Sequence, residues 1–219
     1  MATEKPQAGG EPRGRDLPPG RVDFSMMYFT HDAFLRDLRR FADAVASGRG
    51  TAPSVRTGWE TFKKQLHFHH VAEDEALWPP LRRAVTDPAE IAVLDLMESE
   101  HSMIDPMFTR IDAALTAGGR GLGDLVQEMT TALGTHMRHE EDRALPLIEK
   151  HLGPAGWDHY TDYSRKTNGL KNGGLYLAWL LDDMPPATEQ TVLGLLPPPV
   201  RFLYRRVFKP RYARTPRWV

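Results

Sequence analysis

The sequence of 219 residues contains no cysteine. Disulfide bonds are therefore excluded, and so are metal sites built on thiolates, such as iron–sulfur clusters and zinc fingers. The nine histidines and the acidic residues leave imidazole and carboxylate as the donors of any metal site. Such donors suit iron, manganese and zinc. Because the chain has no disulfide frame, we expect a cytoplasmic location.

The sequence also lacks a long hydrophobic run. Its longest uninterrupted apolar stretch, Leu175 to Leu181, is far shorter than the roughly 20 residues that a membrane-spanning helix needs. We therefore expect neither a transmembrane nor a secretory segment. The net charge is only −1 at pH 7, so overall charge gives no reason to expect nucleic acid or an anionic membrane as the partner.

Apolar residues are scarce near the N-terminus, where residues 1–22 contain four prolines among glycines and charged residues. A segment of this composition cannot bury a core, so we expect a disordered tail. We expect the rest of the chain to divide into a helical domain at residues 23–152 and a helical, basic and aromatic extension at residues 153–219.

Four amphipathic segments are found at about residues 22–47, 53–85, 88–117 and 122–151. In each, apolar side chains recur at the three- and four-residue spacing of one helix face. Short connections containing glycine or proline separate the segments. This arrangement predicts an all-α, up-down-up-down four-helix bundle with a helical C-terminal extension.

Two of these segments share a motif. One copy runs from His69 to Pro79 and the other from His136 to Pro146. In each, a histidine precedes a glutamate by four positions, an acid follows the glutamate, and a proline stands six positions after it. The i, i+4 spacing places imidazole and carboxylate on one helix face, about one turn apart. Two matching copies indicate a metal-ligand pair on each of two helices.

Polar residues interrupt the apolar face of all four segments. The interrupting residues are His31, His69, Glu73, His101, His136 and Glu140. These side chains would point into the bundle, where an unpaired charge costs several kcal/mol, so a shared metal centre is expected to compensate them. Asp105, one turn after His101, is a further candidate, either as a ligand or as an acid hydrogen-bonded beside the ligands.

Five neighbouring residues are less strongly indicated. His67, His70 and His139 lie next to the predicted ligands in the sequence, but we expect them on other helix faces, in solvent or in supporting positions. Asp74 and Glu141 are expected on flanking faces, where they would orient ligands or meet water.

Six protein ligands exceed the three that a catalytic zinc ion usually has. They suit two octahedral ions that share bridging carboxylates and leave a position open, which is typical of non-haem iron; manganese or a mixed pair is also compatible. The ferritin-like class of bundle uses two Glu-x-x-His motifs, whereas this sequence has one, at Glu98–His101. Ferritin-type chemistry is therefore disfavoured.

Together, these residues resemble the hemerythrin-like, or HHE cation-binding, family over about residues 24–151. The resemblance rests on His31 with Asp32, on the two His-x-x-x-Glu motifs with their Leu-Trp-Pro and Leu-Pro tails, and on Glu100-His101-x-x-Ile104. It implies a bundle around two iron ions with a bridging oxo or hydroxo group. It also implies that O2, peroxide or nitric oxide binds at an open iron position.

The same resemblance implies terminal histidine ligands and bridging glutamates, namely His31, His69, His101, His136, Glu73 and Glu140. Two positions depart from the oxygen-carrying members. Those members have a histidine in place of Asp105. They also have an aspartate five residues after the fourth-helix histidine, whereas in this sequence Glu140 follows that histidine by four residues. Fewer imidazoles and more carboxylates would lower the reduction potential and leave coordination positions open. We therefore hypothesise catalase-, peroxidase- or oxidase-like turnover rather than reversible O2 transport. The expected pocket wall is Phe34, Phe62, Met97 and Phe108.

The extension permits other functions. Residues 201–219 contain seven Arg or Lys, five aromatic residues and no acid. This pattern fits RNA, single-stranded DNA or an anionic membrane surface. It also fits a helix that packs Val200, Leu203 and Val207 against the bundle, or against a second subunit of a homo-oligomer, and we favour packing. A non-catalytic oxygen or iron sensor that signals through this extension is the alternative to turnover, and a purely structural metal site is the third hypothesis.

Overall fold

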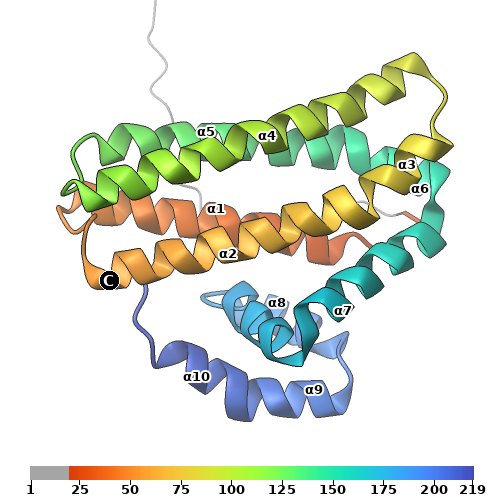
Figure 1. The fold of residues 1–219 in the computed structure, drawn as a ribbon. Helices are drawn as coiled ribbons and strands as arrows, with labels where there is room; N and C mark the ends of the chain where they lie inside the picture. Colours follow the sequence, from red (N-terminus) through yellow and green to blue (C-terminus); the bar gives the residue numbers. More distant parts are fainter. Residues whose placement is uncertain (1–19) are drawn as a thin grey trace, which may run out of the picture.

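A computed structural model describes residues 20–219, and this part of the chain contains helices and no strand. The four long helices of the bundle are α1 (Ser25–Ala46), α2 (Pro53–Ala76), α4 (Pro88–Thr116) and α5 (Leu122–His139). In Figure 1, α4 and α5 lie side by side above α1 and α2, and the C-terminal helices lie on the opposite side of α1 and α2. The all-α class and the four-helix bundle predicted from the sequence are confirmed.

Local sequence sets the ends of these helices. Pro53 and Pro88 stand in the first turns of α2 and α4, where the fixed φ of proline fits and no N–H is needed. Asp87 caps α4, because its Oδ1 accepts a hydrogen bond from the backbone N–H of Ala89 at 2.8 Å. Gly48 follows α1 with a φ of 73°, a left-handed conformation that favours glycine and ends the helix.

The proline of the first motif copy interrupts its helix. Pro79 has no N–H to donate to the carbonyl of Glu75, four residues earlier. The regular helix α2 accordingly gives way at Leu77, where φ is −112°, to the short helix α3 (Trp78–Ala84). The segment predicted as one helix over residues 53–85 is therefore two helices in sequence.

The second copy responds to its proline with a π-helical turn. In η1 (Glu140–Ala144) the helix is wider than an α-helix, and the N–H of Leu145 donates to the carbonyl of Glu140, five residues earlier. Helix α6 (Leu145–His151) then continues with Pro146 in its first turn. Turns of this kind are frequent at functional sites, and this one begins at a predicted metal ligand.

Two apolar clusters fill the bundle, and the predicted metal ligands lie between them. The first cluster includes Phe34, Leu38, Phe41, Val55, Trp59, Phe62, Leu66, Ile104, Ile111, Met129 and Leu133. The second includes Met27, Ala72, Leu77, Leu81, Leu94, Met97, Ala144, Leu145 and Ile148. Helices α1, α2 and α4 thus each contribute to both apolar clusters, and α5 reaches the second cluster through its continuation into residues 140–151.

The C-terminal extension is helical. Its elements are α7 (Gly153–Leu180), α8 (Pro186–Gly194), α9 (Pro198–Leu203), the π-helical turn η2 (Tyr204–Phe208) and α10 (Lys209–Ala213). Helix α7 bends at Gly169, whose φ of 61° and ψ of 176° are not helical. The bend separates a first half beside α6 from a second half that reaches the first apolar cluster.

Buried aromatic residues join the extension to the bundle. Trp179 of α7 is completely buried, and its Nε1 donates a hydrogen bond to Oδ2 of Asp37 at 2.8 Å. The chain end returns to the start of α2, where the N–H of Trp218 donates to the carbonyl of Ser54 at 3.1 Å, as the position of the C-terminus in Figure 1 illustrates. The ring of Trp218 lies 5.4 Å from that of Phe41. The extension and the bundle therefore share one core.

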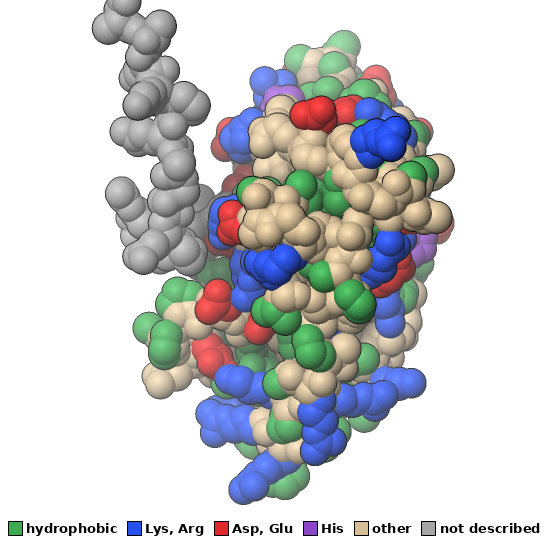
Figure 2. Space-filling view, turned by 90° about the vertical axis from the view of Figure 1, so that its left-hand side faces the viewer, with side chains coloured by type: hydrophobic (Ala, Val, Ile, Leu, Met, Phe, Trp, Pro, Cys, Tyr) green, Lys and Arg blue, Asp and Glu red, His purple; other side chains and the backbone are tan. Residues whose placement is uncertain are grey.

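Residues 201–219 bury three of their five aromatic side chains, Tyr204, Tyr212 and Trp218, and expose most of their basic side chains. Figure 2 shows Lys and Arg side chains gathered at the lower end of the molecule. The exposed basic residues of this segment include Arg205, Arg206, Lys209, Arg211 and Arg214. Packing against the bundle is therefore observed, but not through all of the expected residues: Tyr204 is buried, whereas Val207 is 45% exposed. The π-helical turn η2 changes the helical period here, which the sequence analysis did not anticipate.

Most of the predicted N-terminal tail, residues 1–19, lies outside the described residues. The last part of the predicted tail belongs to the fold, since Val22 is buried and the backbone N–H of Arg21 donates to Oε1 of Glu149 at 3.0 Å. From residue 20 to residue 219, no helix combines the length and the apolar character that crossing a membrane requires.

Replacement of Trp179 by alanine tests whether the extension is part of the bundle core. We expect Trp179→Ala to lower the free energy of unfolding of the metal-free chain by about 3–5 kcal/mol, because it leaves a cavity between α7 and α1. Urea denaturation measures this change. The control is Leu170→Ala on the same helix, where the leucine is 68% exposed and the change should stay within about 0.5 kcal/mol. Equal effects of the two substitutions would contradict a shared core.

Candidate metal centre

Every bundle helix contributes donors to the polar layer. His31 comes from α1, His101 from α4, and His136 from α5. The two glutamates, Glu73 of α2 and Glu140 of η1, are completely buried, as is His31. The layer therefore places side chains far apart in the sequence at one level of the bundle.

The donors form two groups. One is His31, His69 and Glu140, and the other is His70, His101 and His136. Within each group, one donor atom from each residue lies within 4.8 Å of the others. These are spacings at which three side chains can bind one cation.

Glu73 connects the two groups. Its Oε1 lies 3.1 Å from Nε2 of His69, and its Oε2 lies 3.5 Å from Nε2 of His101. The two oxygens of one carboxylate thus face imidazoles of different groups. This is the arrangement that a carboxylate bridging two ions requires.

Most of the donor atoms have no hydrogen-bond partner within the described chain. Such atoms are Nε2 of His31, His69 and His70, and both oxygens of Glu73 and of Glu140. Nε2 of His31 lies 3.1 Å from Oε2 of Glu140, but not with the geometry of a hydrogen bond. Buried polar atoms are nearly always satisfied in folded proteins, because an unsatisfied one costs several kcal/mol. Nitrogen and oxygen donors left free in this way fit a pair of metal cations.

Carboxylates face the other ring nitrogen of three of the histidines. The pairs are His31 Nδ1 with Glu141 at 2.8 Å, His101 Nδ1 with Asp74 at 2.9 Å, and His136 Nδ1 with Glu100 at 3.1 Å. A carboxylate at Nδ1 keeps a proton on that nitrogen and directs Nε2 toward the centre, which is the usual support of a metal-binding histidine.

In both copies of the motif, the acid that follows the glutamate contacts Nδ1 of a histidine on another helix. Asp74 follows Glu73 on α2 and orients a histidine of α4, while Glu141 follows Glu140 and orients a histidine of α1. Each copy of the motif therefore supplies a pair of predicted ligands and also positions a predicted ligand of another helix. Glu100 has a similar role but lies outside the motif, and it also accepts a hydrogen bond from Nδ1 of His139 at 2.7 Å.

The two buried glutamates are in different electrostatic environments. Burial raises the pKa of Glu140, but His31 outweighs burial and lowers that pKa to about 2. Burial lowers the pKa of His31, which Glu140 and Glu141 nevertheless raise to about 9. Burial and repulsion from Glu140 raise the pKa of Glu73 well above its usual value of 4.5. The protein thus disfavours the negatively charged form of Glu73, which a cation beside it would stabilise.

The imidazoles of α2 are held in the form that binds metals. Burial, followed by repulsion from His31, lowers the pKa of His69 well below 6.5. Burial and repulsion from His101 do the same for the pKa of His70. Both rings are therefore neutral at physiological pH, with a lone pair free for coordination.

The structure brings the six main predicted residues together but differs from the sequence analysis at two positions. Asp105 is exposed and belongs to neither donor group, so its inclusion as a ligand is corrected. His70, expected on another helix face, is buried and belongs to the second group. The cause is the wide buried arc of α2, which packs against α1, α4 and α7 and so encloses two consecutive positions.

The expected pocket wall is found in part beside the cluster. The ring of Phe34 lies 5.5 Å from that of His69, and Phe62 packs on Phe34 at 5.6 Å. Phe108 is one ring further away, against Trp59 at 5.6 Å, and Met97 belongs to the second apolar cluster. Of these four residues, Phe34 is thus the one with a ring contact to a histidine of the cluster.

The extension adds aromatic residues that the sequence analysis did not include. Trp179 packs on Phe34 at 4.9 Å and so continues the wall beside His69. Tyr160 of α7 is buried, and its pKa is raised by burial and then by the negative charges of Glu73 and Glu140. Both lie beyond the repeated motif, so no local signal in the sequence connects them with the centre.

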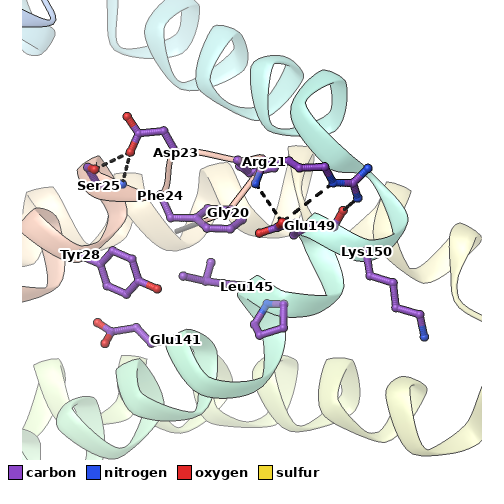
Figure 3. A pocket seen from close by; sticks show the side chains of 12 residues that line it. Gly20, Arg21, Asp23, Phe24, Ser25, Tyr28, Glu141, Leu145, Glu149 and Lys150 are labelled. Carbon is purple, nitrogen blue, oxygen red and sulfur yellow. Dashed lines mark hydrogen bonds and ion pairs between the residues drawn. The ribbon is translucent and has the colours of Figure 1, made fainter. Parts of the chain in front are cut away.

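A surface pocket approaches the centre at the start of α1. It has a volume of about 540 Å³ and is lined by residues that include Arg21, Tyr28, Glu141, Glu149 and Lys150. Figure 3 shows Tyr28 and Glu141 close to each other on its wall. Because Glu141 contacts Nδ1 of His31, one carboxylate separates this pocket from the donor cluster.

A helical bundle with a buried layer of imidazoles and carboxylates defines a class of metal-binding proteins. Comparison with family models gives one match, the hemerythrin HHE cation binding domain, over residues 22–148. The chain therefore belongs to the hemerythrin HHE cation-binding family, as its motifs indicated. Searches of curated proteins and of solved structures gave no match.

The supporting carboxylate Glu100 offers a test of the centre. We expect Glu100→Gln to weaken metal binding by about 10- to 100-fold, because His136 loses the group that orients it. Competition with a chelator for Mn²⁺ or Fe²⁺ measures the affinity. The matched control is Glu98→Gln, two residues earlier on α4, where the side chain is exposed and pairs with Arg82 at the surface. If the two variants bind metal equally well, Glu100 does not support the centre.

Proposed function

We propose that this protein is a non-haem di-iron protein that binds O2, peroxide or nitric oxide at an open iron position and turns over O2 or peroxide. The proposal rests on the buried donors that have no hydrogen-bond partner among residues 20–219, namely three imidazole nitrogens and four carboxylate oxygens. Structural histidines and glutamates at such depth are normally paired with each other or with the backbone. A cation pair is the partner that suits all of them at once.

Two ions are favoured over one by the division of the donors. The two groups share no residue, and Glu73 faces both of them. With Glu73 and Glu140 as bridging carboxylates, His31 and His69 would hold one ion, and His101 and His136 the other. A bridging oxo or hydroxo group would complete the pair.

Iron is favoured by the chemistry of the donors. Imidazole and carboxylate with a position left open are typical of non-haem iron, whereas a catalytic zinc ion usually takes fewer protein ligands. Manganese or a mixed pair has the same donor preference and is the alternative occupant.

A cytoplasmic location is proposed from the absence of cysteine alone.

The protein would position the ions and keep water out. The donors lie between two apolar clusters, and Phe34 and Trp179 cover the side of His69. When bound, two iron ions would supply two electrons by changing together from ferrous to ferric. These are the two electrons that, with two protons, would convert H2O2 to two water molecules. Oxidation of a second H2O2 to O2 would return the electrons and protons, which gives catalase-like turnover.

Iron loading of the protein tests the proposal. We expect about two iron ions per chain, near-ultraviolet absorption from an oxo-bridged ferric pair, and consumption of peroxide. The same protein loaded with zinc should neither absorb there nor consume peroxide. Metal analysis, optical spectra and an oxygen electrode measure these properties. Stable oxy-form spectra through repeated oxygenation cycles, without peroxide consumption, would instead indicate reversible O2 binding.

Glu73 provides the corresponding variant. We expect Glu73→Ala to lower the iron content to one ion per chain or fewer and to abolish peroxide consumption, since the two oxygens of Glu73 face imidazoles of both groups. Glu75→Ala, an exposed position on the same helix, is the matched control and should retain both properties. An unchanged iron content in Glu73→Ala would contradict a bridged pair.

A non-catalytic sensor is the second candidate, because the extension contacts the centre. Phe34 packs both on His69 and on Trp179 of α7, so a change at the centre has a direct route to the extension. In a sensor, metal or oxygen occupancy would change how the extension docks on the bundle. A partner would then contact the basic face of residues 201–219, although nucleic acid or membrane remains the less favoured interpretation.

Limited proteolysis separates the two candidates. A sensor predicts that cleavage within residues 181–219 slows at least several-fold when the metal-free protein is loaded with iron. For an enzyme whose extension is permanently docked, the two rates should be equal. Mass spectrometry identifies the cleavage sites, and cleavage near residue 20 serves as the internal control.

A further inference from the structure

His70 is the one buried histidine of the cluster that was not among the six main predicted ligands. Its side chain comes from α2, directly after His69, and the residue is 7% exposed. The ring stacks on that of His101 with 3.9 Å between centroids and an angle of 14°, and it lies 5.4 Å from the ring of His136. Its Nε2 is buried without a hydrogen-bond partner in the described chain.

We propose that His70 is a metal ligand, the third imidazole of the ion that His101 and His136 hold. The inference rests on the proposed function, because it assumes that the metal pair exists. It depends on two independent observations. The donor atoms of these three histidines lie within 4.8 Å of one another. Nε2 of His70 has no hydrogen-bond partner among the described residues.

The position one turn after His101 does not provide this imidazole. Residue 105 is an aspartate and its side chain is exposed, so α4 supplies one ligand rather than two. His70 reaches the same ion from α2 instead. The three imidazoles of this ion would then come from three helices, α2, α4 and α5.

With His70 as a ligand, the two ions would have different numbers of imidazole ligands. The copies of the motif correspond residue by residue, and the counterpart of His70 in the second copy is Met137, which is buried but has no nitrogen donor. One ion would therefore have three imidazoles and the other two, from His31 and His69. This difference predicts two distinguishable iron environments in one protein.

Substitution of His70 tests the inference on the full chain. We expect wild type loaded with 57Fe to give two Mössbauer doublets of equal area. In His70→Gln, the affinity for one of the two ions should fall by at least the 10- to 100-fold that loss of a supporting partner causes. At saturating iron, one doublet should shift while the other is unchanged, and X-ray absorption should detect one imidazole fewer per pair. His67→Gln, on the same helix but exposed, should match wild type.

Stability of the metal-free protein distinguishes a ligand from a structural residue. A buried imidazole with an unsatisfied nitrogen destabilises the metal-free fold, so His70→Leu should unfold at the same or a higher urea concentration than wild type. The same variant should gain less stability from added Fe²⁺ than wild type does. A structural histidine would give the opposite result, a loss of stability without metal and an unchanged gain with metal.

A double variant tests the geometry. Because position 105 faces outward, His70→Gln combined with Asp105→His should bind metal no better than His70→Gln alone. Recovery of wild-type affinity would overturn the assignment of this ligand to α2.

The outcomes also separate this inference from the proposed function. If wild type binds a metal pair and His70→Gln has wild-type affinity and spectra, the assignment of His70 is wrong and the di-iron function stands. If wild type binds no metal pair, both are wrong.

Discussion

The rest of the structure depends on one constraint, the burial of two carboxylates and five imidazoles at one level of an otherwise apolar bundle. The bundle pairs His31 with Glu140, but it leaves Glu73 without compensation and several ring nitrogens without partners. Such a layer costs stability unless cations bind it, so folding and metal binding favour the same arrangement of helices. The two apolar clusters on either side provide the stability that fixes the layer in place.

The repeated motif is understandable as a unit that serves this layer. Its histidine and glutamate point into the centre from one helix, and the acid that follows the glutamate orients the histidine of the helix opposite. Its proline ends regular α-helical hydrogen bonding just beyond the ligands, by a helix break after α2 and by the π-helical turn η1. Each copy of the motif thus provides predicted ligands, an acid that orients a histidine of another helix, and a distortion of its own helix. The pair α1 and α2 is therefore related to the pair α4 and α5 by an approximate twofold correspondence.

Much of this could be predicted from the sequence, because the relevant signals are local. Helical periodicity predicted the bundle, and polar interruptions of apolar faces predicted six residues of the cluster. The errors arise where a non-local contact decides burial. Asp105 shares a nominal face with His101 but is exposed, whereas His70 is buried against His101 of α4 and His136 of α5. The sequence does not reveal how the helices are rotated against one another, so His70 could not be assigned to the centre. Trp179 lies on α7, beyond the motif, and the sequence does not reveal where that helix docks.

His70 also changes the argument about reactivity. The expectation of turnover rested on a shortage of imidazoles relative to the oxygen carriers, yet five imidazoles meet in this cluster. If His70 binds the ion of His101 and His136, the number of imidazoles no longer distinguishes turnover from reversible binding, and access to the other ion becomes the deciding factor. That ion would lie beside His31, whose Nδ1 is hydrogen-bonded to Glu141, and Glu141 lines the surface pocket near Tyr28. A carboxylate between solvent and an ion's ligand is suited to the proton uptake that peroxide reduction requires, whereas reversible O2 binding requires no net protons. The position of Glu141 thus supports turnover on grounds independent of ligand count.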